Sequence, residues 1–136
     1  MQTSAESVYL DSSALVKLVE QEAESLALQQ YLISRPYQVS CALARVELIR
    51  AVARKGDLET VLRARQLLPR LVLIDLDENL LDDAATLAPS TLRSLDAIHL
   101  AAARSLGRDM GAFVTYDARL AVAARQLGFT VDAPGR

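Results

Sequence analysis

Short apolar runs alternate with helical segments along the whole sequence, and this order constrains the fold more than any other feature. The first run is Ser7–Leu10, and it ends at an acid, Asp11. Short apolar runs without polar alternation are typical of parallel strands, which helices cover on both faces. Strands and helices in strict alternation therefore predict a three-layer α/β domain with a parallel central sheet.

The expected elements cover nearly the whole chain. The expected strands are Ser7–Leu10, Tyr37–Ser40, Leu71–Leu76, Ala112–Tyr116 and Phe129–Asp132. The expected helices are Ser12–Glu20, Glu22–Ser34, Cys41–Lys55, Asp57–Leu68, Glu78–Leu87, Ser94–Leu106 and Ala118–Leu127. Asp57 is a plausible N-cap, and Gly107 and Gly128 follow the last two helices, where glycine favours a helix end. Because no repeat or linker is visible, we expect residues 1–136 to form a single domain.

Composition excludes several classes of protein. Hydrophobic residues make up 51% of the chain, which excludes general disorder. The chain has 1 Cys and 1 His, which excludes a disulfide framework and a zinc site rich in Cys or His. The net charge of −2 excludes a broad polycation but leaves room for a local basic patch. The first residues resemble neither a signal peptide nor a membrane span, so a cytoplasmic location is expected.

Four acids stand in unusual positions. Asp11 follows the first expected strand and Asp117 follows the fourth, so both lie at one edge of the sheet if those strands are neighbours. Asp96 and Glu47 lie within helices among apolar residues. A buried carboxylate is costly unless it is paired, neutralised or bound to a metal ion.

Each of these acids also has a purely structural interpretation. Asp11 and Asp117 could cap the helices that follow them, and Asp96 could stabilise its helix N-terminus. Glu47 could pair with an arginine of its own helix. Taken together, however, four acids without His or Cys favour a site for a hard cation such as Mg²⁺ or Mn²⁺. An ion held in this way can activate a water and stabilise charge on a phosphate, which makes phosphodiester hydrolysis the natural hypothesis.

The stretches VYLDSSALVKL, ARVELIRA, LDAIHLAAA and FVTYDARLAVAARQLGF resemble the PIN-domain ribonucleases. They are most similar to the VapC toxins of bacterial toxin–antitoxin pairs, in order and over nearly the whole chain. The resemblance implies a PIN-like fold with a five-stranded parallel sheet between helices. It also implies an endoribonuclease dependent on Mg²⁺ or Mn²⁺, which forms a homodimer and binds a small antitoxin along a helical groove.

The resemblance also assigns residues. The family's four metal-holding, catalytic acids fall on Asp11, Glu47, Asp96 and Asp117. Its small hydroxyl residue and the Thr of its T-x-D stretch fall on Ser13 and Thr115, which we expect to orient carboxylates or water. Some PIN nucleases have a further acid where this chain has Arg119. One-metal and two-metal mechanisms therefore both stay open.

Several other residues near the acids are weaker candidates. The candidates for guiding an RNA backbone are Lys17, Arg45, Arg50, Arg93 and Arg119, although each also suits a solvated helix surface. His99 is expected to be a packed or hydrogen-bonded helix residue rather than a general base, and Cys41 a small buried thiol.

Two classes of enzyme with the same sheet architecture fit poorly. A receiver-like phosphoacceptor needs an acidic pair near the first strand and a late lysine, but no lysine follows Lys55. A haloacid-dehalogenase-type phosphatase needs a second acid where this chain has Ser13. The remaining alternative is a catalytically inactive binding module on a PIN scaffold, which the presence of all four acids disfavours.

Overall fold

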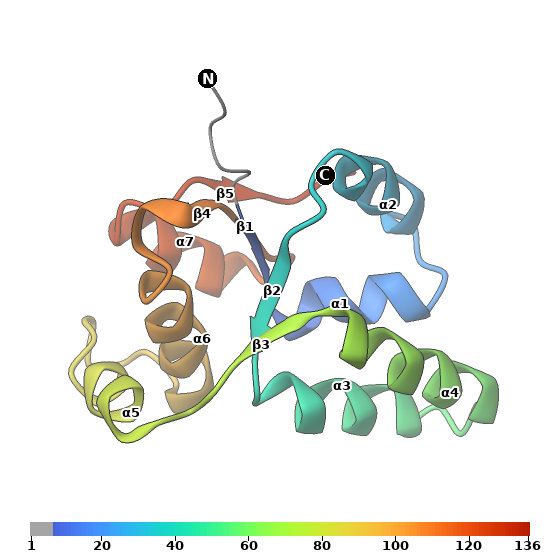
Figure 1. Cartoon of the computed structure of the whole chain (residues 1–136), viewed down its shortest axis with the longest axis horizontal. Coiled ribbons are helices and arrows are strands. Elements are labelled where there is room, and N and C mark those ends of the chain that lie inside the picture. The colour runs from blue at the N-terminus through green and yellow to red at the C-terminus, as the bar shows by residue number, and fades with distance from the viewer. Residues whose placement is uncertain (1–6) are drawn as a thin grey trace.

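A parallel five-stranded sheet forms the centre of the computed structural model, which describes residues 7–136 (Figure 1). The strands are β1 (Ser7–Leu10), β2 (Gln38–Cys41), β3 (Val72–Ile74), β4 (Met110–Val114) and β5 (Val131–Asp132). Their order in the sheet is β3-β2-β1-β4-β5, and every pair is parallel. The chain adds strands to one side of β1 and then to the other, so the strand order reverses next to β1. This confirms the predicted α/β fold and places its switch point beside β1.

Helices cover both faces of this sheet. They are α1 (Ser12–Val19), α2 (Ser25–Ile33), α3 (Ala44–Ala53), α4 (Leu58–Leu67), α5 (Glu78–Ala85), α6 (Ser94–Arg104) and α7 (Ala118–Gln126). Two short 3₁₀ turns, Leu68–Arg70 and Gly107–Asp109, precede β3 and β4. Figure 1 shows α1 to α4 on one side of the sheet and α5 to α7 on the other.

The central strand β1 contributes to two separate cores. Val8 and Leu10 pack with α1 to α4, whereas Tyr9 packs with α5 to α7. Successive strand side chains point to opposite faces, so a strand covered on both faces must be apolar at every position. The Tyr9 ring stacks on Phe113 of β4 with 5.2 Å between ring centroids. Phe129 also packs on this α6 side, whereas Tyr31 and Tyr116 pack in the core on the opposite face.

The largest differences from the expected elements lie at their ends. The helix expected from Cys41 begins only at Ala44, because Cys41 continues β2 and pairs with Ile74 of β3. The fourth strand begins at Met110 and ends at Val114, two residues earlier than expected. The early end leaves residues 115–117 in a loop at the sheet edge. Asp57 caps α4 as predicted, by accepting a hydrogen bond from the Glu59 backbone N–H.

A partly buried ion-pair cluster joins α1, the start of α2 and the C-terminal residue. Lys17 Nζ donates to Glu22 Oε1 at 3.1 Å and to Glu24 Oε1 at 2.7 Å. Arg136 Nε donates to Glu24 Oε2 at 2.7 Å. The hydrogen bonds from Lys17 and Arg136 lower the pKa of Glu24 from 4.5 to about 2.

This cluster predicts a component of acid unfolding. Because the pKa of Glu24 is lower in the folded chain, its stabilisation is complete above about pH 4.5 and is lost as pH falls toward 2. Glu24→Gln should lower the free energy of unfolding at pH 7, and its difference from the wild type should shrink over that interval. Urea titrations at stepped pH measure this, with Glu78→Gln at an exposed acid of α5 as the control. Parallel pH profiles for the wild type and Glu24→Gln would contradict the prediction.

Candidate active site

Asp11 is a buried carboxylate at the carboxyl end of the central strand. It lies beside Thr115 because Leu10 of β1 pairs with Val114 of β4. Its Oδ1 accepts hydrogen bonds from Ser13 Oγ at 2.7 Å and from the Ala14 backbone N–H at 3.0 Å. Its Oδ2 accepts one from Thr115 Oγ1 at 2.6 Å. Burial raises the pKa of Asp11, and these donors oppose the rise by stabilising the charged form.

Asp117 follows β4 and begins α7 at the same edge. Its Oδ1 accepts hydrogen bonds from the backbone N–H groups of Arg119 at 2.9 Å and Leu120 at 3.2 Å. Its own backbone N–H donates to Thr115 Oγ1 at 3.1 Å, so Thr115 links the two acids. Asp11 and Asp117 therefore do cap helices, and the same geometry places both acids at one end of the sheet.

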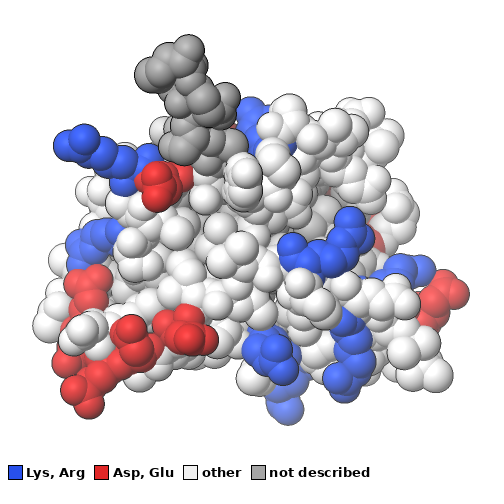
Figure 2. Space-filling view, viewed as in Figure 1, with Lys and Arg blue, Asp and Glu red and all other residues white. Residues whose placement is uncertain are grey.

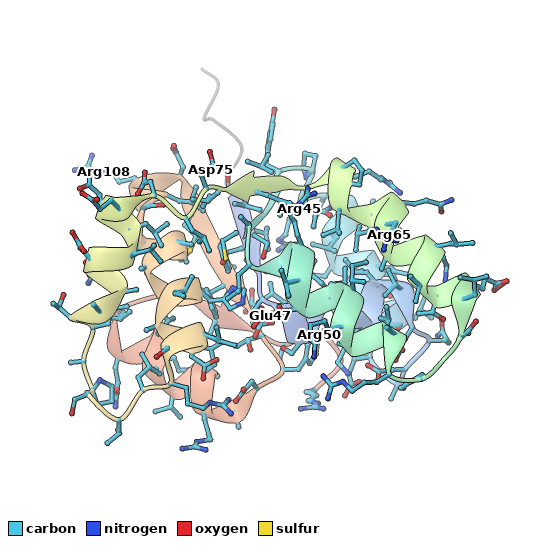
Figure 3. The ribbon with its side chains drawn as sticks, turned by 90° about the horizontal axis from the view of Figure 1, so that it is seen from below. Arg45, Glu47, Arg50, Arg65, Asp75 and Arg108 are labelled. Carbon is cyan, nitrogen blue, oxygen red and sulfur yellow. The ribbon has the colours of Figure 1, made fainter. Side chains whose placement is uncertain are left out.

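Glu47 lies on α3 and is held from across the sheet edge by α6. Its Oε1 accepts hydrogen bonds from Ser12 Oγ and from His99 Nε2, the latter at 2.7 Å. The structural alternative, in which Glu47 pairs with an arginine of its own helix, is therefore wrong, because Glu47 is turned toward His99 of α6. Figure 3 shows Glu47 between α3 and α6, with Arg50 beside it on the same helix. Burial raises the pKa of Glu47, but the hydrogen bonds from His99 and Ser12 outweigh this effect and lower it.

His99 is buried, with 3% of its surface exposed. Its Nδ1 lies 2.8 Å from the Tyr9 hydroxyl and 3.8 Å from Cys41 Sγ. Burial lowers its pKa, but hydrogen bonds to Cys41 and Glu47 outweigh burial and raise the pKa to about 10. His99 is thus the hydrogen-bonded helix residue that the sequence predicted, and Cys41 is buried as expected.

Asp96 lies in the first turn of α6, and the Arg93 side chain pairs with both Asp96 and Asp117. Arg93 Nε lies 3.2 Å from Asp96 Oδ2, and Arg93 Nη2 lies 3.4 Å from Asp117 Oδ2. The Arg93 guanidinium therefore bridges the two acids. Its side chain is 61% exposed, so solvent screens both pairs.

One cavity of about 390 Å³ collects these groups. Its lining includes the four predicted acids together with Ser12, Ser13, Arg93, Ser94, Leu95, His99 and Leu120. A larger cavity of about 580 Å³ lies between α5 and the start of α6, but no ionisable side chain lines it. The chemistry-bearing residues therefore belong to the smaller cavity. Thr115 does not line it but supports it through Asp11.

Four carboxylates line this cavity, so the ligand atoms that it offers are oxygens. Oxygen is the ligand atom that a hard divalent ion prefers. As placed within residues 7–136, no three Asp, Glu, His or Cys side chains form a group that could hold an ion. Arg93 stands between Asp96 and Asp117 and pairs with both. The four carboxylates therefore match a divalent ion in chemical kind, and Arg93 would have to move for Asp96 and Asp117 to share one.

Charge is divided across the surface beside this cavity. Figure 2 shows basic side chains over α3 and α4 and acidic side chains over α5. Among the predicted basic candidates, Arg45, Arg50 and Arg119 are exposed. Lys17 differs, because it is 8% exposed and held by Glu22 and Glu24. Lys17 is therefore engaged with these two acids rather than exposed beside the cavity.

Sequence reasoning did not find the roles of Ser12 and Tyr9, which complete the contacts around Glu47 and His99. A partial signal was available for His99, which follows Asp96 by three residues and so shares its helix face. The role of Tyr9 could not be predicted in this way, since a tyrosine within an apolar strand is usually a core residue.

Comparison with known proteins agrees with this architecture. The PIN domain family model matches residues 8–126. Ribonuclease VapC46 of Mycobacterium tuberculosis is 51% identical over 128 residues, which cover 93% of this chain and 97% of that protein. Ribonuclease VapC47 of the same species is 46% identical over 132 residues, covering 94% and 97%. Ribonuclease VapC35 is 42% identical over 133 residues, covering 95% and 98%.

A solved structure shows the same fold. The crystal structure of Mycobacterium tuberculosis VapC20, a sarcin–ricin loop cleaving toxin, aligns with a TM-score of 0.72 at 16% identity and covers 93% of this chain and 99% of that one. Fold and family model together define a PIN domain. The chain belongs to the PIN-domain family and, within it, to the VapC ribonucleases. Among the described residues, no helix is long and apolar enough to cross a membrane.

The Arg93 bridge predicts a change in cation affinity. Arg93→Ala should make Mn²⁺ bind the RNA-free protein about 1.4- to fivefold more tightly, because an exposed ion pair contributes about 0.2–1 kcal/mol. Calorimetric titration of Mn²⁺ measures this, and Arg108→Ala, outside the cavity, is the control. Weaker Mn²⁺ binding by Arg93→Ala would show that Arg93 does not compete for these carboxylates.

Proposed function

We propose that this chain is a divalent-metal-dependent endoribonuclease and the toxin of a VapBC-type toxin–antitoxin pair. One observation carries the proposal: four carboxylates from four separate segments line one cavity at the switch point of the sheet. They come from the end of β1, from α3, from α6 and from the loop before α7. VapC ribonucleases are the relatives at 42–51% identity, which supports the same activity.

The four acids that would hold Mg²⁺ or Mn²⁺ are Asp11, Glu47, Asp96 and Asp117. When bound there, a divalent ion lowers the pKa of a water and offsets the negative charge that develops on a phosphate. Asp11 is the rigid member, because Ser13, Ala14 and Thr115 fix both of its oxygens. Asp96 is the adjustable member, because its contact with Arg93 is exposed, whereas backbone N–H groups of α7 also hold Asp117 through Oδ1.

The chain's own cations would bring RNA to this negative cavity. Arg45 and Arg50 lie exposed on α3, the helix that carries Glu47, and Arg119 lies on α7 beside Asp117. Arginine binds phosphate oxygens through paired N–H groups, so these residues suit an RNA backbone. Displaced from the carboxylates, Arg93 would join them. An RNA substrate implies a cytoplasmic site of action.

Asp96→Asn tests the assignment with little structural cost, since exposed Arg93 is the one described residue that pairs with this side chain. We expect RNA cleavage in Mg²⁺ or Mn²⁺ to fall by about 10²–10³-fold, the usual cost of removing one electrostatic group from an active site. Thermal unfolding should change little. Asp82→Asn on α5, outside the cavity, is the matched control.

The same loss of RNA cleavage is expected for Asp11→Asn. Metal-dependent cleavage retained by both variants would overturn the assignment, and RNA binding without cleavage by the wild type would indicate an inactive PIN-scaffold module.

Removal of the ion provides a second test. EDTA should abolish cleavage and excess Mn²⁺ should restore it. The product ends should carry no 2′,3′-cyclic phosphate, because water rather than the RNA 2′-hydroxyl attacks the phosphorus. Mass spectrometry of a short cleaved RNA identifies the ends. Cyclic phosphates, or full cleavage in EDTA, would show a different mechanism.

We further propose that the protein forms a homodimer and binds a small cognate antitoxin, as expected for a VapC toxin. Large apolar side chains on α2 and α4 are free to contribute to such contacts. Examples are Leu26, Ile33, Leu58 and Leu62, which are 50–81% exposed. Light scattering coupled to gel filtration would give the mass, and a monomer at micromolar concentration would contradict the homodimer.

A further inference from the structure

We propose that His99 is a positioning residue that holds the Glu47 carboxylate by one oxygen, so that the other oxygen is presented to a divalent ion. This inference rests on the proposed function and deepens it. It concerns how the site is pre-organised rather than which groups react. Three observations carry it, namely the contacts at Glu47, the contacts that fix His99, and the burial of the whole arrangement.

The first observation is that both hydrogen-bond donors to Glu47 contact the same carboxylate oxygen, Oε1. His99 Nε2 lies 2.7 Å from Glu47 Oε1, and Ser12 Oγ donates to that atom as well. No described residue donates to Glu47 Oε2. The two donors come from α6 and α1, so they hold the carboxylate from two directions. One oxygen is thus fixed by the protein, and the second remains for a ligand in the cavity that Glu47 and His99 both line.

The second observation is that His99 is itself fixed. The Tyr9 hydroxyl lies 2.8 Å from His99 Nδ1, and the two rings meet edge to face at 77° with 5.8 Å between centroids. The contact with the Tyr9 hydroxyl holds the His99 ring at Nδ1, and this orientation turns Nε2 toward Glu47.

The third observation is burial. Tyr9 is fully buried and stacked on Phe113, and His99 is 3% exposed. Rings packed this tightly have few other rotamers, so they hold Glu47 more firmly than a solvent-exposed partner would. By contrast, Arg93 holds Asp96 and Asp117 through an exposed side chain. The cavity therefore combines Asp11 and Glu47, which partly or fully buried groups hold, with Asp96 and Asp117, whose shared contact with Arg93 is exposed.

Binding of Mn²⁺ alone to the full chain tests this role without any RNA. His99→Leu should weaken Mn²⁺ binding at least about tenfold, because residues that orient metal ligands typically contribute 10- to 100-fold to affinity. His99→Gln should recover most of the loss, since the glutamine amide can place an N–H near the position of Nε2. Tyr9→Phe, which keeps the ring and removes the hydroxyl, should give a smaller loss of the same sign.

A double variant separates positioning from general damage to the fold. In a Glu47→Ala background, His99→Leu should have no further effect on Mn²⁺ affinity, because its role is exerted through Glu47. Leu100→Ala is the matched control, since Leu100 is the next residue of α6 and fully buried. It should lower thermal stability and leave Mn²⁺ affinity unchanged, with all affinities measured below the melting temperature of each variant.

The outcomes distinguish this inference from the proposed function. If Glu47→Ala weakens Mn²⁺ binding and His99→Leu does not, the positioning role is wrong and the metal site stands. If His99→Leu weakens binding equally with and without Glu47, its effect is structural and the inference is again overturned. If Glu47→Ala binds Mn²⁺ as tightly as the wild type, the proposed metal site is wrong.

Discussion

Parallel pairing between β1 and β4 places two strand ends side by side, and the candidate active site depends on that contact. Asp11 leaves the end of β1 almost fully buried, in surroundings that disfavour a charge. Its charge is tolerated because Thr115, from the end of β4, and Ser13, from the first turn of α1, donate to its oxygens. The same threonine accepts the backbone N–H of Asp117, so one strand pair sets the positions of two acids.

The remaining two acids reach the same cavity from opposite faces of the sheet. Glu47 belongs to α3, which packs with α1 and α4, whereas Asp96 belongs to α6, which packs with α5 and β2. Like charges gathered at one edge repel each other. The protein offsets that repulsion with His99 at Glu47 and with Arg93 between Asp96 and Asp117. The buried contact is firm and the exposed one is weak, so the cavity is partly organised before any ion or RNA binds.

The sequence predicted what depends on local pattern. Continuous apolar runs predicted the parallel sheet. Asp11 and Asp117 directly follow two of these runs, which predicted that both acids lie at strand ends. It did not predict the partner of Glu47, because His99 lies 52 residues away and a helical arginine was the nearer choice. It likewise missed the burial of Lys17, whose ion-pair partners follow in a loop and at the start of α2. Helix periodicity does not show which face meets another element, so contacts across the sheet edge require the fold.

We propose that carboxylates from four segments together hold divalent metal in this cavity. Paramagnetic broadening of amide signals, measured while Mn²⁺ is titrated into isotopically labelled protein, tests this most directly and needs no RNA. We expect the signals around Asp11, Glu47, Asp96 and Asp117 to broaden together and at the lowest Mn²⁺ concentrations. Broadening that begins instead over the exposed acids of α5, with the four cavity segments unaffected, would contradict it.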